Sequence, residues 1–336
     1  MPNDKVKPID VVVIGVGLVG SEFLEQVIES PHPFRLVLIS SSKTTIFSPD
    51  GICFPNGDWN GLLKTSSPKL DLAEVIPDLA ASVKRGSHVV VVDNTSSDDV
   101  AALYPDFLKA GLDVITPNKK AYSGELSLYE RIVEASLESG AKFLNEATVG
   151  AGLPIISTLK DLIGTGDTVT KIEGVFSGTM SYIFNEFSTG KADGPSFSSV
   201  VKVAREKGYT EPHPADDLNG ADVARKLTIL SRLIPSLRSA LPDGYKSVTT
   251  TSLVPEALKA VATGDEFISH VQNGLIKADL ERYPDTHPFA TSLGGSDNII
   301  MFHTKRYGAR PLIVQGAGAG AAVTAMGVMS DMLKLV

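Results

Sequence analysis

Short apolar runs alternate with longer amphipathic stretches in the first half of the chain. The runs are rich in β-branched residues and nearly free of polar interruptions, which is typical of strands buried on both faces of a parallel sheet. They predict strands at residues 11–14, 36–39, 89–92, 114–116 and 143–144. The amphipathic stretches predict helices at residues 21–30, 70–84, 98–110 and 125–139. Strands that alternate with helices indicate an α/β domain with a doubly wound parallel sheet.

Beyond about residue 152 the alternation is lost. Helices are expected at residues 154–163, 181–187 and 221–234, and strands at 171–175, near 275–280, at 298–303 and at 311–315. This order predicts a second, α+β domain. The final stretch, 319–335, reads as a helix too apolar to stand alone, and we expect it to pack against the first domain. The predicted domains are therefore 1–153, completed by 316–336, and 154–315.

Composition narrows the class of protein. At roughly 150 residues per domain, 336 residues suit two domains. The 31 basic and 39 acidic side chains give a net charge of −8, which argues against nucleic acid or an anionic membrane as the main partner. The single cysteine, Cys53, excludes an internal disulfide and favours a reducing compartment. The polar N-terminus does not resemble a signal peptide, and no apolar run reaches the ~20 residues of a membrane helix, so we expect a cytoplasmic protein.

The first predicted strand runs into a glycine motif, Gly-x-Gly-x-x-Gly, at Gly15, Gly17 and Gly20. In such a motif the first glycine permits a tight turn, the second lets a pyrophosphate approach the backbone, and the third lets helix and strand pack closely. The intervening Leu18 and Val19 open the helix, whose unpaired N–H groups attract phosphates. Three glycines can also form a plain tight turn. Here strand, spacing and helix agree, and together they predict a Rossmann-type site for NAD or NADP.

The end of the second predicted strand bears on the choice of cofactor. NAD sites of this type usually carry an acid there, which binds the ribose 2′-hydroxyl. This chain instead has three serines followed by Lys43. Hydroxyl groups and an ammonium would accept a 2′-phosphate, so we hypothesise that Ser41 and Lys43 let NADP bind at least as well as NAD. A solvated loop is the alternative interpretation.

Two more loops follow predicted strands at the edge where doubly wound sheets bind ligands. In the loop 93–97, Thr95 and Ser96 could contact the cofactor or cap the next helix. In the loop 116–120, Lys119 and Lys120 could be an exposed charged pair. Their place beside a Thr-Pro-Asn turn favours a lysine that points into the cleft.

Chemistry in the second domain is suggested by the segment 208–226. It holds four carboxylates, Glu211, Asp216, Asp217 and Asp222, ahead of Lys226. Asp222 and Lys226 are four residues apart on the predicted helix and therefore share one face. The adjoining apolar stripe is formed by Val223, Leu227 and Leu230. An exposed ion pair after a polar loop is the simpler interpretation, but clustered acids on a Pro/Gly-rich loop suit the grip of an amino group.

Taken together, these motifs resemble homoserine dehydrogenase in its monofunctional fungal form. The resemblance covers most of the chain and includes two long strings, NEATVGAGLPII from Asn145 and FSGTMSYIFNEF from Phe176. It implies an oxidoreductase that interconverts L-aspartate 4-semialdehyde and L-homoserine with NAD or NADP, in the biosynthesis of threonine, methionine and isoleucine. It also implies a homodimer.

The resemblance further assigns roles to single residues. It implies that Lys226 is the general acid/base and that Lys120 lies between nicotinamide and substrate, with Asp222 in the same pocket. The implied substrate contacts are Glu211, Asp217, Thr179 and Gly178. A second cofactor contact is implied in the turn 316–320, at Gly318 and Gly320. A site for sodium or potassium is implied at Glu146 with the carbonyl groups of Val149, Ala151 and Leu153.

Two alternatives remain open at this point. One is another semialdehyde-linked dehydrogenase on the same fold, although Cys53 lies in the wrong place for a cysteine nucleophile. The other is a catalytically silent protein that senses dinucleotides, against which the acid–lysine segment argues.

Overall fold

The computed structural model describes residues 7–54, 57–68, 70–187, 194–207, 209–210, 215–254, 259–261, 263 and 294–336. The chain divides into two compact units. The first comprises residues 1–148 and 321–336, and the second comprises residues 149–320. The domain boundaries expected from the sequence, after residue 153 and before residue 316, each lie five residues from these divisions.

The first unit is built on a seven-stranded sheet with the order β4-β3-β2-β1-β5-β6-β7. Neighbouring strands from β2 to β7 in this order run parallel. They are the five predicted strands: β1 (Ile9–Ile14), β2 (Phe34–Ser40), β5 (His88–Asp93), β6 (Asp113–Ile115) and β7 (Phe143–Leu144). The predicted parallel sheet lacked one edge of the observed sheet, because β3 (Thr44–Phe47) and β4 (Ser67–Pro68) are short antiparallel strands with little apolar signal.

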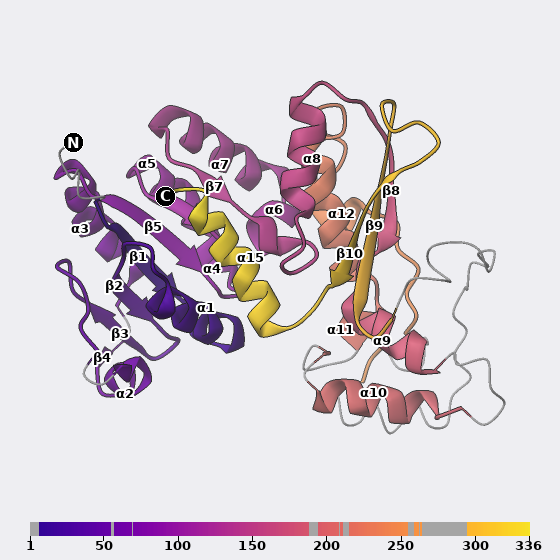
Figure 1. The fold of residues 1–336 in the computed structure, drawn as a ribbon, viewed down its shortest axis with the longest axis horizontal. Coiled ribbons are helices and arrows are strands. Elements are labelled where there is room, and N and C mark those ends of the chain that lie inside the picture. Colours follow the sequence, from indigo (N-terminus) through magenta and orange to yellow (C-terminus); the bar gives the residue numbers. More distant parts are fainter. Residues whose placement is uncertain are drawn as a thin grey trace. The chain divides into compact units, whose positions relative to one another are not determined.

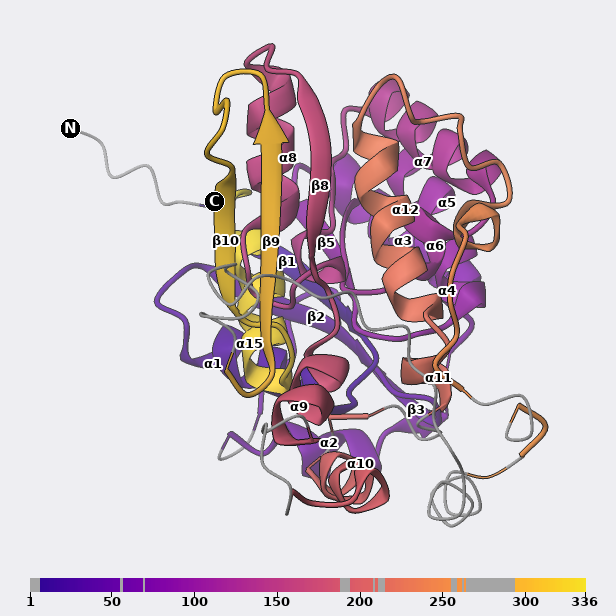
Figure 2. The same cartoon turned by 90° about the vertical axis from the view of Figure 1, so that its right-hand side faces the viewer.

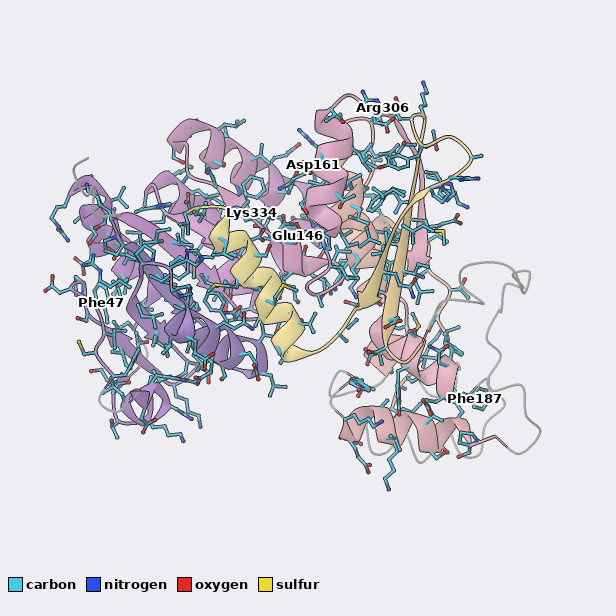
Figure 3. All side chains as sticks on the ribbon, in the orientation of Figure 1. Phe47, Glu146, Asp161, Phe187, Arg306 and Lys334 are labelled. Carbon is cyan, nitrogen blue, oxygen red and sulfur yellow. The ribbon has the colours of Figure 1, made fainter. Side chains whose placement is uncertain are left out.

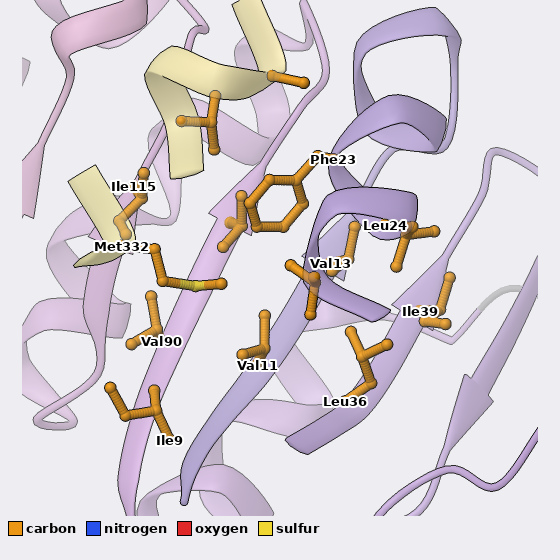
Figure 4. Packing of buried hydrophobic residues seen from close by; sticks show 14 of the residues in the cluster. Ile9, Val11, Val13, Phe23, Leu24, Leu36, Ile39, Val90, Ile115 and Met332 are labelled. Carbon is orange, nitrogen blue, oxygen red and sulfur yellow. The ribbon is translucent and has the colours of Figure 1, made fainter. Parts of the chain in front are cut away.

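Helices cover both faces of this sheet, as the doubly wound fold requires. One face packs against α1 (Leu18–Glu29), α2 (Trp59–Lys64) and the C-terminal α15 (Ala321–Leu333). Figure 4 shows Met332 of α15 beside Ile9, Val90 and Ile115 of the strands. The predicted return of the last helix to the first domain is therefore confirmed. Of the described residues, no helix is both long and apolar enough to cross a membrane.

The remaining helices of the first unit are α3 (Leu72–Lys84), α4 (Asp98–Ala102), α5 (Tyr104–Lys109), α6 (Lys120–Ser123) and α7 (Leu126–Ser139), followed by the 3-10 turn η2 (Glu146–Thr148). The single helix predicted for 98–110 is wrong in one respect. The chain breaks at Leu103 between α4 and α5, because Pro105 fits only into the first turn of a new helix.

The second unit contains a three-stranded antiparallel sheet with the order β10-β9-β8. Its strands are β8 (Val169–Val175), β9 (Asp297–Thr304) and β10 (Leu312–Ala317), close to three of the predicted ranges. Its helices are α8 (Ile155–Gly164), α9 (Gly178–Phe187), α10 (Phe197–Glu206), α11 (Ala215–Leu218) and α12 (Ala221–Leu233), followed by the turn η3 (Gly244–Ser247). Figures 1 and 2 show α8 and α12 running beside the strands. The strand predicted near 275–280 lies outside the described residues.

Candidate active site

The glycine turn has the geometry that its sequence requires. Gly15 adopts φ +86°, a conformation that side chains rarely allow. A Cβ atom on Gly20 would lie 2.0 Å from the Gly15 carbonyl oxygen, so only glycine lets α1 pack on this turn. Gly17 differs from both, because a Cβ there would meet no atom within 4 Å. The open space at Gly17 is what a ligand close to the backbone would occupy.

A cavity of about 700 Å³ lies directly above this turn, at the carboxyl ends of β1 and β5. Its lining combines the glycine turn, the loop after β2 and the loop after β5: Ile14, Gly15, Val16, Gly17, Ser41, Ser42, Asn94, Thr95, Ser96, Ser97 and Val100. Of the predicted cofactor residues, Ser41, Thr95 and Ser96 thus come together. Leu18 is exposed at the start of α1, and Val19 packs against the core. The cavity fits a dinucleotide bound across the first unit.

Asn94 is a lining residue whose importance the sequence did not reveal. Both its side-chain nitrogen and its side-chain oxygen are buried and lack a hydrogen-bond partner among the described residues. Buried amides are seldom left unpaired, so this one fits a bound ligand that supplies partners. Its place next to Thr95 in the strand-end loop was the available signal.

Ser41 shapes the loop that was predicted to choose between NAD and NADP. Its hydroxyl accepts hydrogen bonds from the backbone N–H groups of Lys43 (3.1 Å) and Thr44 (2.9 Å). The side chain therefore fixes a tight turn at the cavity wall. Because the Ser41 side chain is uncharged, it would not repel a 2′-phosphate.

Lys120 begins helix α6 in the loop after β6. Its backbone N–H donates to Asn118 Oδ1 at 3.0 Å, and its ammonium contacts Asp98 Oδ2 at 2.9 Å.

The hydrogen bonds of the neighbouring loop 93–97 show which residue caps α4. Ser97 accepts from Val100 N–H, whereas Thr95 accepts from Ser97 N–H and is not the cap.

In the second unit, Lys226 is only 8% exposed. Its ammonium lies 2.6 Å from Asp222 Oδ2, so the predicted sharing of one helix face by these two residues is confirmed. It also donates to the Phe176 carbonyl oxygen at 2.7 Å. An ammonium has three hydrogens, and these contacts use two of them. The simpler interpretation, an exposed ion pair, is excluded by the burial of the lysine.

Asn298 of β9 is the second residue that sequence reasoning missed. Its Nδ2 donates to the same Phe176 carbonyl oxygen at 3.2 Å, and its Oδ1 is buried without a hydrogen-bond partner among the described residues. A Cβ on Gly318 would lie 2.0 Å from Asn298 Cγ, so Gly318 leaves room for this amide. We call Lys226, Asp222, Asn298 and the Phe176 carbonyl the Lys226 cluster.

The other predicted substrate residues differ in how far they can be placed. Thr179 is buried and donates to the Tyr209 carbonyl at 2.5 Å, and Gly178 is hemmed in by Ala319 and Ser296. Asp217 is buried at the end of α11. Glu211 lies outside the described residues.

The predicted apolar stripe on α12 is only partly right. Leu230 is buried, but Val223 and Leu227 are only half-buried. The buried face is instead formed by Ala224, Lys226, Thr228, Ile229, Leu230 and Arg232. Leu227 faces a cavity of about 430 Å³, which explains its partial exposure.

Glu146, the predicted carboxylate ligand of a monovalent cation, is buried near the end of the first unit. Figure 3 labels Glu146 and Lys334, and the Lys334 ammonium lies 3.3 Å from Glu146 Oε2. The backbone N–H of Glu146 donates to Asp331 Oδ2 at 2.7 Å. Burial raises the pKa of Asp331, against the opposing effect of its hydrogen bond with Lys334. In the second unit, Ala151 is the one non-glycine of the described residues with positive φ, +54°.

Geometry and fold together define a class of protein. A dinucleotide cavity at the carboxyl edge of a doubly wound sheet, with a second unit that buries a lysine against a carboxylate, is the arrangement of an NAD(P)-dependent oxidoreductase.

Comparison with known proteins narrows the class. Residues 15–146 match the sequence model of the homoserine dehydrogenase NAD-binding domain, and residues 154–333 match that of homoserine dehydrogenase. The chain is 43% identical to the homoserine dehydrogenase of Saccharomyces cerevisiae, with 98% of each chain covered. The value for the Schizosaccharomyces pombe enzyme is 42%, with 98% of this chain and 95% of that enzyme covered. A crystal structure of a Candida auris protein of unknown function is 39% identical, with a TM-score of 0.82 over 98% of both chains. This chain belongs to the homoserine dehydrogenase family, and the resemblance to its fungal, monofunctional members is confirmed.

Proposed function

We propose that the protein interconverts L-aspartate 4-semialdehyde and L-homoserine, with Lys226 as general acid and base. The observation that carries this proposal is the buried ammonium of Lys226, oriented by Asp222 and by the Phe176 carbonyl. Two of its hydrogens are engaged by these partners, and the third serves the oxygen of the substrate. Family membership supports the reaction and its place in threonine, methionine and isoleucine biosynthesis.

When bound, NADPH or NADH supplies the hydride that reduces the aldehyde carbon. The carbonyl oxygen then gains negative charge, which an ammonium at hydrogen-bond distance stabilises while it donates the proton. In the oxidation of homoserine, Lys226 must be neutral and accepts the proton from the hydroxyl group. Lys120 lies between cofactor and substrate, while Glu211, Asp217, Thr179 and Gly178 hold the amino acid.

The cofactor is held by the glycine turn, by Thr95 and Ser96, and by the second contact at Gly318 and Gly320. The neutral Ser41 turn and Lys43 support use of NADP at least as well as NAD. Solved homoserine dehydrogenases include a hyperthermophilic archaeal enzyme in complex with NADPH, 21% identical to this chain. A sodium or potassium ion at Glu146 and the carbonyls of Val149, Ala151 and Leu153 would order the backbone there. That cation site, the homodimer and the cytoplasmic location stay predictions.

A direct assay tests the proposal. Purified protein is mixed with NADPH and L-aspartate 4-semialdehyde, the absorbance at the NADPH band is followed, and homoserine is identified as the product by chromatography. Homoserine oxidation is followed in the reverse direction across pH 6 to 10. We expect its rate to rise with pH, because the base must lose its proton. Absence of homoserine, or a rate independent of pH, would contradict the proposal.

A further inference from the structure

A second buried polar cluster lies in the first unit, and neither the proposed mechanism nor the glycine turn uses it. Asp93, the last residue of β5, is fully buried. Its Oδ1 accepts from Thr95 N–H at 2.8 Å. Its Oδ2 accepts from the Tyr104 hydroxyl at 2.5 Å and from Asn118 Nδ2 at 3.0 Å. All three donors are neutral.

The cluster continues into the loop after β6. Thr116 donates its hydroxyl hydrogen to the Asp93 carbonyl oxygen at 2.6 Å and accepts from Asn118 N–H at 2.8 Å. Asn118 donates to the Ser97 carbonyl at 3.0 Å and accepts from the backbone N–H of Lys120 at 3.0 Å. Tyr104 and Thr116 are as deeply buried as Asp93, and Asn118 is nearly so. We call Asp93, Tyr104, Thr116 and Asn118 the Asp93 cluster.

We propose that Asp93 is a positioning residue that holds the cofactor loop and Lys120 in one rigid arrangement, with Asn118 as the link between them. The proposal rests on the function proposed above, because it concerns the place of Lys120 in that reaction. Through Thr95 N–H, Asp93 sets the loop that lines the cofactor cavity. Through Asn118, it sets the backbone at Lys120.

A purely structural role does not explain the placement of this charge. A buried carboxylate without a cation costs free energy that hydrogen bonds must offset, and an apolar side chain would avoid that cost. Burial, reinforced by the Asp93 charge, raises the pKa of Tyr104 well above its ordinary value, so this phenol remains a donor throughout the working pH range. The donors therefore meet a fixed acceptor, and the loops they belong to cannot shift independently.

The chain supplies a matched control in the same sheet. Asp113, the first residue of β6, is also buried and accepts two hydrogen bonds, from His88 Nε2 at 2.7 Å and from Lys142 N–H at 2.6 Å. Neither partner lines the cofactor cavity. Asp93→Asn and Asp113→Asn thus each replace a buried acceptor by an amide of the same shape, but only the first touches the loops of the site.

The experiment compares these variants with the wild type in three readouts: thermal unfolding, the Kd for NADPH by fluorescence titration, and kcat and KM for homoserine. For Asp93→Asn we expect kcat to fall about 100-fold and the NADPH Kd to rise about 10-fold, since small misplacements of catalytic groups have effects of this size. The KM for homoserine should change less than about 3-fold, because its contacts lie elsewhere. Asp113→Asn should lower the melting temperature but leave all three constants within about 2-fold.

Asn118→Ala tests the proposal even if Asp93→Asn fails to fold. It removes the side chain that connects Asp93 to Lys120, while Asp93 still accepts from Thr95 N–H and the Tyr104 hydroxyl. It should reproduce the fall in kcat, and the double variant should lose no more than the more severe single variant, as residues of one network do. Wild-type values of kcat and NADPH Kd in Asn118→Ala, or equal kinetic losses in Asp113→Asn, would overturn the proposal. If the wild type fails to oxidise homoserine, the proposed function fails, whereas the NADPH titration still judges the effect of Asp93 on the cofactor loop.

Discussion

The Asp93 cluster and the Lys226 cluster both bury a charged side chain, but they stabilise it by different means. Among the described residues, the side chain of Asp93 accepts hydrogen bonds only from neutral donors, which come from three segments of the first unit. Lys226 meets the opposite charge of Asp222 at 2.6 Å and one carbonyl oxygen in the second unit. The neutral donors around Asp93 fix the positions of the loops and do not neutralise its charge. In the Lys226–Asp222 ion pair the charges balance each other, and the Lys226 ammonium still carries a proton that can be transferred. The first arrangement suits the positioning of loops, and the second suits acid–base chemistry.

The largest effect should follow from removing the buried ammonium of Lys226. Lys226→Ala is expected to lower kcat for homoserine oxidation by about 10³-fold, because general acid–base groups contribute typically 10²–10⁴-fold. The NADPH Kd should stay within about 2-fold, since Lys226 is not among the proposed cofactor contacts. Steady-state kinetics and fluorescence titration measure the two quantities.

Lys202→Ala is the matched control for that variant. Lys202 also pairs with an acid four residues away on a helix, Glu206, but the distance is 4.0 Å and both side chains are largely exposed. Its removal should leave kcat unchanged. A similar fall in kcat for both variants, or loss of NADPH binding in Lys226→Ala, would mean that Lys226 has a structural role only.

Substitutions in the glycine turn should give the next largest effect. They distinguish a glycine needed for cofactor binding from one needed for helix packing. Gly17 has negative φ and open space around its missing Cβ, so Gly17→Ala should fold with an unchanged melting temperature. It should raise the NADPH Kd at least about 10-fold, because the methyl group would fill space needed by the pyrophosphate. Thermal unfolding and fluorescence titration test both statements.

Gly20→Ala provides the contrast. Its Cβ would lie 2.0 Å from the Gly15 carbonyl oxygen, so α1 must move away from the turn. Overpacking of this kind costs about 1–3 kcal/mol, and the melting temperature should fall together with NADPH affinity. If Gly17→Ala also unfolds at lower temperature, or binds NADPH normally, the open space at Gly17 is not a ligand site.

How much of this could be predicted from the sequence depends on how local each signal is. The five parallel strands were predictable because burial on both faces leaves uninterrupted apolar runs. Helix α10 was overlooked although its signal is present: Phe197, Val200, Val201 and Ala204 follow helical spacing, and Ser196 caps the first turn. The edge strands β3 and β4 have no comparable signal, since both are short, β3 is mostly half-buried and β4 is exposed.

The site shows the same dependence on distance along the chain. Asp222 and Lys226 could be paired from their spacing of four residues on one helix. The Phe176 carbonyl and Asn298 could not, because they lie 50 and 72 residues from Lys226 and are brought to it by the β8–β9 pairing. The loop 93–97 was visible in the sequence, but the pairing of Asp93 with Tyr104 and Asn118 is decided by the packing of α5 and of the loop after β6.

A smaller effect is expected when a negative charge is added to the turn at Ser41. Ser41→Asp keeps an oxygen that can accept from Lys43 and Thr44 N–H, so the turn should persist. The new carboxylate would repel a 2′-phosphate and raise the KM for NADP by about 10-fold or more, with the KM for NAD little changed. Ser41→Asn is the neutral control and should shift the preference much less. Equal effects of Asp and Asn on both cofactors would show that the turn, and not its charge, matters.

The smallest effect concerns stability and the ion pairs of the second unit. The Glu173 carboxylate accepts from Lys171 on its own strand and lies 2.6 Å from His303 Nε2 on β9. The hydrogen bond with Lys171, together with that from His303, lowers the pKa of Glu173 below its ordinary value near 4.5, against the opposing effect of burial. A carboxyl group whose pKa is lowered on folding stabilises the protein above its unfolded-state pKa, and this stabilisation is lost as the pH falls through the folded-state value.

Glu173→Gln should therefore be less stable than the wild type at pH 7, by about 1 kcal/mol, and the difference should vanish as the pH falls well below 4.5. Thermal unfolding from pH 7 to pH 3 measures it, with Glu206→Gln as the control for an exposed and longer ion pair, which should change little. If the stability difference between Glu173→Gln and the wild type stays constant over this range, Glu173 acts by packing. Lys226 with Asp222 would then be the remaining example of stabilisation by an ion pair to set against the neutral donors of Asp93.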